Sequence, residues 1–138
     1  MKLLSLFSRK QITDHNQERG LLGEKAASRY LKKQGLKILV RRYRCRFGEI
    51  DLVARDGDTL VFVEVKLRAS RSFGDPSQAV TPEKQKHMSR VALDYLRRLN
   101  HPHIPVRFDV VEVVLQPEKT ECHHIRDSFS LVEPYIYG

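Results

Sequence analysis

Four charged side chains stand inside two apolar runs that a tight turn joins. They are Glu49, Asp51, Glu64 and Lys66. The runs lie within residues 46–66 and are rich in Val, Ile, Leu and Phe. Between them, Asp56-Gly57-Asp58 is a turn signal, because glycine supplies positive φ and aspartate tolerates it. We therefore expect a β-hairpin that carries charges where buried strands prefer aliphatic side chains.

Strand alternation predicts where the charges of the first run point. Glu49 and Asp51 are two residues apart, so they should share one face of their strand. Ile50 and Leu52 should then take the opposite face, which can pack into the core. The acids would thus lie side by side on a polar face.

The turn decides which residues of the two strands meet. Glu64 and Lys66 share a face of the second strand by the same alternation. If the two-residue loop is Gly57-Asp58, Asp51 lies across from Glu64, and Glu49 lies across from Lys66. If the loop begins one residue earlier, the pairing slides by two and Glu49 meets Glu64. Either register gathers three carboxylates and one ammonium on one face, whereas a three-residue loop would misalign them.

Carboxylates gathered in this way would repel one another. Cross-strand neighbours are about 5 Å apart, and like charges at that distance are costly unless something compensates them. A hard divalent cation bound by oxygen ligands is the simplest compensation, and Lys66 can supply only part of it. The hairpin therefore predicts a cation-binding site.

The overall charge indicates the class of partner. The chain has 138 residues, with 25 Lys and Arg against 17 Asp and Glu and a formal net charge of +8. This balance favours a polyanion, usually nucleic acid; the alternative is charge that only keeps the protein soluble. Cys45 and Cys122 show no metal-ligand spacing, so we expect free thiols in a cytoplasmic protein.

The N-terminal apolar run is too short to span a membrane. We expect a mobile leader over residues 1–15 and a single domain over residues 16–138. Its first helix should cover residues 16–34, capped by Asn16 or Asp14 and closed by Gly35. Glu24 falls at the margin of the apolar stripe of this helix. A lone acid there ordinarily serves the helix dipole; the alternative is a carboxylate that leans toward the charged face of the hairpin.

Arginines crowd the strand expected over residues 36–45 and the start of the hairpin. The cations around Tyr43 are Arg41, Arg42, Arg44 and Arg46. On a sheet edge such charges block edge-to-edge pairing. Next to the carboxylate face they could equally hold phosphates, with Tyr43 available to stack on a base. The sequence leaves both interpretations open.

A polar loop and a second helix should follow the hairpin. Residues 67–76 contain Gly and Pro among small polar residues, which predicts a flexible loop that brings Arg68 and Arg71 to a substrate. Thr81 is the expected N-cap of the helix, with Pro82 in its first turn and Lys84 near the hairpin. Its core stripe is Met88, Val91, Ala92, Tyr95, Leu96 and Leu99.

The remaining chain predicts two more strands. Residues 106–115 should form a strand that is buried on at least one face, with Asp109 as a structural hydrogen-bonding acid, and a short strand should cover residues 123–126. The order of elements describes an α/β fold with a mixed central sheet flanked by helices.

Several motifs, taken together and in order, resemble a known family. Gly48-Glu49-Ile50-Asp51, followed after twelve residues by Glu64-Val65-Lys66, resembles the core of the PD-(D/E)XK nuclease superfamily. More narrowly, the chain is similar to the bacterial YraN-like proteins, which resemble archaeal Holliday junction resolvases. The stretches that carry this similarity are Gly23-Glu24, residues 48–54, residues 60–66, Phe73-Gly74, Ala79-Val80 and residues 107–111. An acid-x-Lys motif alone is a weak signal, whereas the ordered set is specific. Leu67 departs from the small or hydroxylated residue expected after Lys66.

The resemblance implies a restriction-endonuclease-like αβββαβ core and a metal-dependent nucleic-acid hydrolase. The implied ligands of Mg²⁺ or Mn²⁺ are Asp51, Glu64 and the Val65 carbonyl, with Glu49 or Glu24 as an outer or second-metal ligand. Lys66 would orient the attacking water or stabilise the transition state. The side chains expected to hold the backbone of the nucleic acid are Arg42, Arg44, Arg46, Arg68, Arg71 and Lys84.

The expected partner is nucleic acid, with DNA favoured over RNA and with structured or branched DNA favoured as the substrate. A junction-cutting role would suit a homodimer that presents two sites. The main alternative is a nucleic-acid-binding module of the same fold without hydrolytic activity, since a fold does not decide a function. A protein scaffold that uses the basic surface comes third.

Overall fold

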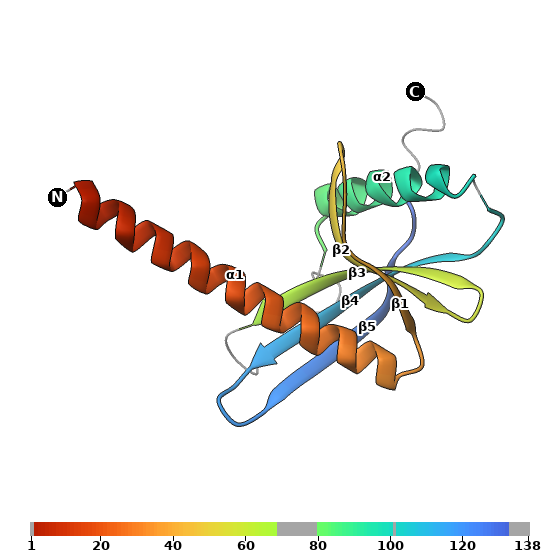
Figure 1. Ribbon diagram of the computed structural model, residues 1–138. Helices are drawn as coiled ribbons and strands as arrows, with labels where there is room; N and C mark the ends of the chain where they lie inside the picture. The colour runs from red at the N-terminus through yellow and green to blue at the C-terminus, as the bar shows by residue number, and fades with distance from the viewer. Residues whose placement is uncertain (1, 69–79, 101, 133–138) are drawn as a thin grey trace.

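The computed structural model describes residues 2–68, 80–100 and 102–132, with side chains from residue 17 onward. Within these residues the chain forms one mixed sheet with a helix on either face (Figure 1). The elements are α1 (Lys2–Lys33), β1 (Lys37–Cys45), β2 (Gly48–Asp56), β3 (Thr59–Arg68), α2 (Pro82–Arg98), β4 (Val106–Leu115) and β5 (Thr120–Phe129).

The sheet has the strand order β1-β2-β3-β4-β5. Only the β3–β4 pair is parallel among the described strands, and α2 forms the crossover between these two. The other pairs are antiparallel, as the tight connections between them require. The predicted α/β fold with a mixed central sheet is therefore confirmed, and its element order is that of an αβββαβ core followed by one more strand.

Each helix buries a separate apolar cluster against the sheet. On the α2 side the cluster is aromatic, with Phe108 stacked on Phe129 at 4.4 Å between ring centroids and Phe62 beside them. On the α1 side it is aliphatic, and Leu31 of the helix packs with residues such as Val63. The alternation of β3 divides its side chains between the two clusters and so fixes the faces on which its charges emerge.

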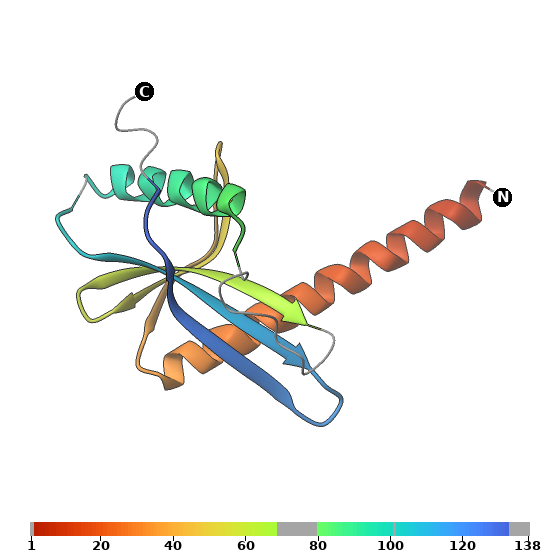
Figure 2. The same cartoon turned by 180° about the vertical axis from the view of Figure 1, so that it is seen from behind.

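Helix α1 begins earlier than the sequence indicated. It starts at Lys2, so the N-cap role expected for Asn16 or Asp14 is wrong, because both residues lie inside the helix. Its N-terminal part projects beyond the sheet in both views (Figures 1 and 2). The helix closes as predicted, since Gly35 takes φ +94° and the Leu36 amide donates to the Leu31 carbonyl. Position 15 is thus no boundary of secondary structure.

Two further expectations are corrected. The last strand covers Thr120–Phe129 rather than residues 123–126, because its half-exposed edge position lets polar residues pair with β4 from Phe108 to Leu115. Leu99 is 44% exposed instead of lying in the core, because it is the C-cap of α2, where the chain turns away. The predicted N-cap of α2 is confirmed, with the Thr81 hydroxyl accepting from the Lys84 amide.

Asp109 has the structural role expected of it. Its carboxylate is fully buried and accepts from the Arg107 guanidinium at 2.9 and 3.0 Å and from the Asp127 amide at 3.0 Å. The His124 ring lies 2.8 Å from the same carboxylate. These hydrogen bonds lower the pKa of Asp109 although burial opposes them.

A buried hydrogen bond fastens α2 to the edge of the sheet. The Tyr43 hydroxyl donates to the Asp94 carboxylate at 2.5 Å, and Arg97 and Arg98 bind the same carboxylate from the helix. Burial and the bond to Asp94 raise the pKa of Tyr43 to about 12. The contact joins β1 to the helix that carries Lys84.

We expect Tyr43→Phe to lower the free energy of unfolding by about 1–3 kcal/mol, because a buried hydrogen bond to a charged group is lost. Tyr95→Phe is the matched control, since the Tyr95 hydroxyl forms no hydrogen bond with the described residues. Urea unfolding of both variants measures the difference. Equal effects of the two substitutions would contradict this role of Asp94.

Candidate active site

The β2–β3 hairpin brings Asp51 to Glu64. Asp56 pairs with Thr59, so the loop is Gly57-Asp58, and the first of the two predicted registers is the one that forms. Backbone pairing ends at Leu52↔Val63. One residue beyond the last backbone pair, the Asp51 carboxylate takes the place of a backbone carbonyl and accepts from the Val65 amide at 2.8 Å. The acid is thereby fixed against the strand that carries Glu64.

The β1–β2 ribbon bends at Asp51. Arg42 takes φ 54° between the pairs Arg41↔Leu52 and Tyr43↔Ile50, a conformation that non-glycine residues rarely adopt. As a result Ile50 packs on the α2 side and Leu52 on the α1 side. The expectation that these two share a face is therefore wrong, because alternation presumes an unbent strand.

The carboxylates of Asp51 and Glu64 lie in a partly buried cluster. Burial, and next the negative charge of Glu64, raise the pKa of Asp51 to about 7, although the Val65 amide opposes the shift. Burial also raises the pKa of Glu64, against the opposing charges of Lys84 and Lys66. Lys84 Nζ lies 3.6 Å from Glu64 Oε1. Burial and the repulsion between the acids therefore outweigh the stabilisation that the nearby ammonium groups give to the charged forms.

Helix α1 brings a third carboxylate to this cluster. Glu24 contributes to the raised pKa of Asp51, so it faces the hairpin and does not merely serve the helix dipole. Arg42 holds it, donating through Nε to both carboxylate oxygens at 2.9 and 3.2 Å. The close approach of α1 to the end of β3 depends on Gly23, because a Cβ there would lie 2.9 Å from the Leu67 side chain. Leu67, the departure from the family pattern, thus packs against the helix.

His87 is a site residue that sequence reasoning missed. Its positive charge, when present, would lower the pKa of Glu64, and its ring occupies the space that a Cβ at Gly48 would take. Gly48 also has φ +136°, which side chains rarely allow. The only available signal was the spacing of three between Lys84 and His87, which sets both on one face of α2.

The other predicted site residues are placed less centrally. Glu49 is bound by the Arg44 guanidinium at 3.0 Å. Arg46 lies over the Phe47 ring at 4.7 Å. Arg68 binds Glu112 of β4 at 2.9 Å, and this carboxylate is 1% exposed, with no partner for Oε1 among the described residues. Arg71 lies outside the described residues.

The donors present suit a hard cation held by few protein ligands. Among the described residues, no three His, Cys, Asp or Glu side chains are grouped so that they could hold a metal ion as they stand. Asp51 spends one oxygen on the Val65 amide and has the other available. Two carboxylates with retained water and substrate oxygens are a usual ligand set for Mg²⁺. Asp51 and Glu64 fit such a site, and a third ligand from Glu24 or Glu49 stays a prediction.

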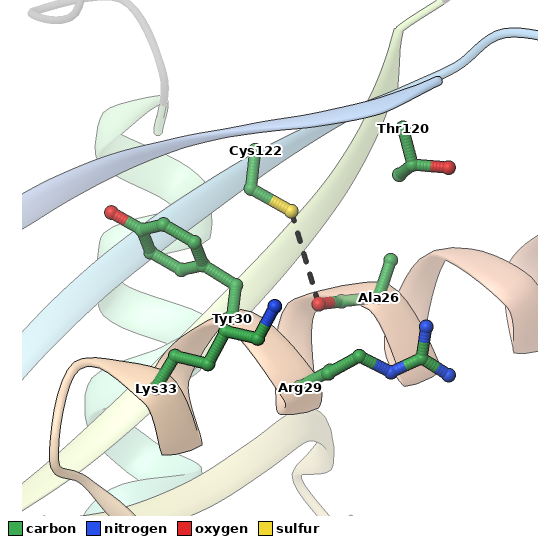
Figure 3. Close-up of a pocket in the computed structure, with 6 residues that line it drawn as sticks. All are labelled: Ala26, Arg29, Tyr30, Lys33, Thr120 and Cys122. Carbon is green, nitrogen blue, oxygen red and sulfur yellow. Dashed lines mark hydrogen bonds between the residues drawn. The ribbon is translucent and has the colours of Figure 1, made fainter. Parts of the chain in front are cut away.

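A hollow on the β5 side of α1 offers no reactive group (Figure 3). It measures about 220 Å³ between α1 and the start of β5. The Cys122 thiol at its wall contacts the Ala26 carbonyl at 3.8 Å, and burial raises the pKa of this thiol. Cys45 and Cys122 are both free, as predicted, and Cys122 is unsuited to act as a nucleophile.

A family model described as "Uncharacterised protein family UPF0102" matches residues 23–113, from the glycine beside Glu24 through β4. The chain belongs to the UPF0102 family. The predicted YraN-like resemblance is thereby confirmed. Every carboxylate and cation of the cluster around Asp51 lies within the matched range.

UPF0102 proteins of several bacteria are similar to this chain over most of its length. The protein of Syntrophus aciditrophicus is 50% identical over 116 residues, which cover 84% of this chain and 91% of that protein. The Symbiobacterium thermophilum protein is 48% identical over 111 residues, covering 80% and 94%. The Geobacter sulfurreducens protein is 45% identical over 118 residues, covering 85% and 92%. In the described part of this UPF0102 chain, none of the helices combines the length and apolarity needed to cross a membrane.

Gly48→Ala should lower the free energy of unfolding by about 1–3 kcal/mol, because the methyl group meets the His87 ring and φ is positive. His87→Ala in the same chain should recover the steric part of this loss. Gly35→Ala is the control, since φ is +94° there with no atom near the added methyl group. Urea unfolding measures all three. If Gly48→Ala lowers the free energy of unfolding no more than Gly35→Ala does, the His87 ring is not what requires glycine at position 48.

The metal-free protein should become less stable as pH rises from 3.8 to about 7. Asp51 keeps its proton over this window in the folded state but releases it when unfolded, so deprotonation favours unfolding. Asp51→Asn should flatten the dependence, because the amide oxygen still accepts from Val65 and cannot ionise. Asp58→Asn, in the exposed turn, should leave it unchanged. Thermal unfolding in chelator across this range gives the slopes, and equal slopes for parent and Asp51→Asn would refute the assignment.

Proposed function

We propose that the protein is a divalent-metal-dependent phosphodiester hydrolase that acts on nucleic acid, with the cluster around Asp51 as its active site. The observation that carries this proposal is the partly buried pair of acids Asp51 and Glu64, where burial, and next the charge of Glu64, raise the pKa of Asp51 to about 7. A site that holds buried carboxylates at such a cost is suited to a cation. The net charge of +8 favours a polyanionic substrate.

Each residue has a distinct role in this proposal. Asp51 and Glu64 would hold Mg²⁺ or Mn²⁺, helped by the Val65 carbonyl. The bound metal would acidify a water molecule and neutralise charge that grows on the phosphate. Lys66, on the same face of β3 as Glu64, orients that water or stabilises the developing charge. The Val65 amide fixes the direction of the Asp51 carboxylate throughout.

The second candidate function is a nucleic-acid-binding module without hydrolytic activity. One observation favours it: Lys84 Nζ already lies 3.6 Å from Glu64, so an ammonium group offsets part of the charge that a metal would otherwise neutralise. Glu24 and Glu49 are likewise held by arginines. Structured DNA, a homodimer and a cytoplasmic location remain predictions for either candidate.

The decisive experiment is cleavage of labelled DNA substrates in Mg²⁺ or Mn²⁺. Branched, flapped, single-stranded and plain duplex DNA form the panel. We expect divalent-dependent cutting that Asp51→Ala and Glu64→Ala abolish. Lys66→Ala should slow it about 100-fold or more, the size of losing one preorganised stabilising group.

Lys86→Ala is the matched control, because this lysine is exposed on α2 and should leave the rate unchanged. Circular dichroism confirms that each variant folds. DNA affinity that persists with no cleavage of any substrate in either metal would establish the binding module instead.

A further inference from the structure

A basic groove runs along the flank of α1 that faces β1, next to the hollow that Cys122 lines, and Arg29 borders both. We define the basic groove by Lys25, Ser28, Arg29, Lys32 and Arg41, which line a hollow of about 270 Å³. It continues into a second hollow of about 160 Å³, which shares three of these residues and reaches Glu24 and Arg42. Each volume exceeds the roughly 30 Å³ share of one water molecule several-fold, so a tetrahedral oxyanion fits.

The floor of the basic groove holds an unsatisfied hydroxyl. Ser28 is 2% exposed, and its Oγ has no hydrogen-bond partner within the described part of the chain. It lines both hollows. A buried hydroxyl without a partner destabilises a fold, so such groups are rare unless a ligand completes them. A hydroxyl can donate to an anion oxygen, as can the ammonium and guanidinium groups around it.

The cations of the basic groove differ from those near the carboxylates. Arg42, Arg44 and Arg68 are each engaged by a carboxylate. In contrast, no ion pair within the described ranges involves the groove cations, which are Lys25, Arg29, Lys32 and Arg41. Like charges gathered in a narrow space repel unless an anion joins them. The groove is thus complementary to a polyanion, whereas three of the arginines expected to grip phosphates, Arg42, Arg44 and Arg68, are held by acids of the protein itself.

The basic groove leads away from the proposed active site. Glu24 stands one helical turn before Ser28, and Lys32 stands one turn after it. With a rise of 1.5 Å per residue, these three positions span about 12 Å along α1. Glu24 would repel a phosphate at the end nearest the carboxylate cluster, which favours a position beside Ser28.

We propose that the basic groove binds backbone phosphates of the nucleic-acid strand that flanks the one at Asp51 and Glu64. This inference rests on the proposed function for the identity of the polyanion, yet it concerns binding and not hydrolysis. Ser28 donates to a phosphate oxygen, and Arg41 closes over it from the edge strand. The groove recognises the phosphate and not the base, so it sets the path of the strand without reading sequence.

The test measures binding in chelator, where no divalent metal can act. Fluorescence anisotropy follows labelled single-stranded DNA and its duplex over a range of salt concentrations. Arg41→Gln should reduce the slope of log affinity against log salt by ~0.7 for the single strand or ~0.9 for the duplex, the loss of one phosphate contact. Arg55→Gln is the matched control, because this exposed arginine lies at the far end of β2 on the other face.

Ser28→Ala separates a ligand-binding hydroxyl from a structural one. We expect affinity to fall about tenfold, as for one hydrogen bond to a charged group, with an unchanged salt slope. The melting temperature should hold or rise, because the free protein loses no hydrogen bond. A lower melting temperature with unchanged affinity would overturn the assignment.

The outcomes separate this inference from the proposed function. If groove variants bind more weakly while the parent cuts no substrate, the hydrolase proposal fails and the phosphate path stands. If the parent cuts DNA yet Arg41→Gln and Ser28→Ala bind as the parent does, the phosphate path fails alone. If the groove variants lose binding to anionic lipid vesicles while their DNA affinity stays intact, the phosphate path is likewise overturned.

Discussion

The hydrogen bond from the Val65 amide to the Asp51 carboxylate is the contact on which the site depends. It forms where the β2–β3 ladder stops, so a side chain replaces the backbone acceptor that an unbent strand would have supplied. Because the Asp51 carboxylate accepts this hydrogen bond, it points toward β3 and not into solvent. The hydrogen bond also fixes the distance between the Asp51 and Glu64 carboxylates, and this distance sets the strength of their electrostatic repulsion.

Charged groups from both faces of the sheet act on these two carboxylates. From α2, Lys84 and His87 bring positive or ionisable groups to Glu64. From α1, Glu24 adds negative charge, which Arg42 restrains. The two helices therefore act as opposed electrostatic controls on one hairpin, and the sheet twist that separates them also separates their charges.

Local signals in the sequence were enough to predict the parts of the fold that depend on neighbouring residues. The turn at Gly57 predicted the hairpin with two possible registers, of which the structure forms one, and Thr81 predicted the start of α2. What could not be predicted depends on elements meeting in space. Arg42, whose positive φ accompanies the change of strand faces, contacts Glu24 eighteen residues earlier in the chain. No periodicity along β1 encodes such a contact.

The packing of Leu67 against Gly23 is an apolar contact that affects the geometry of the site. The contact contains no polar atom, yet it sets how near the first helix stands to the end of β3, and hence where its acid lies relative to the hairpin. Changing the bulk of one aliphatic side chain would shift an anion without altering any charge. The electrostatics of the hairpin therefore depend on an aliphatic contact as well as on its acids.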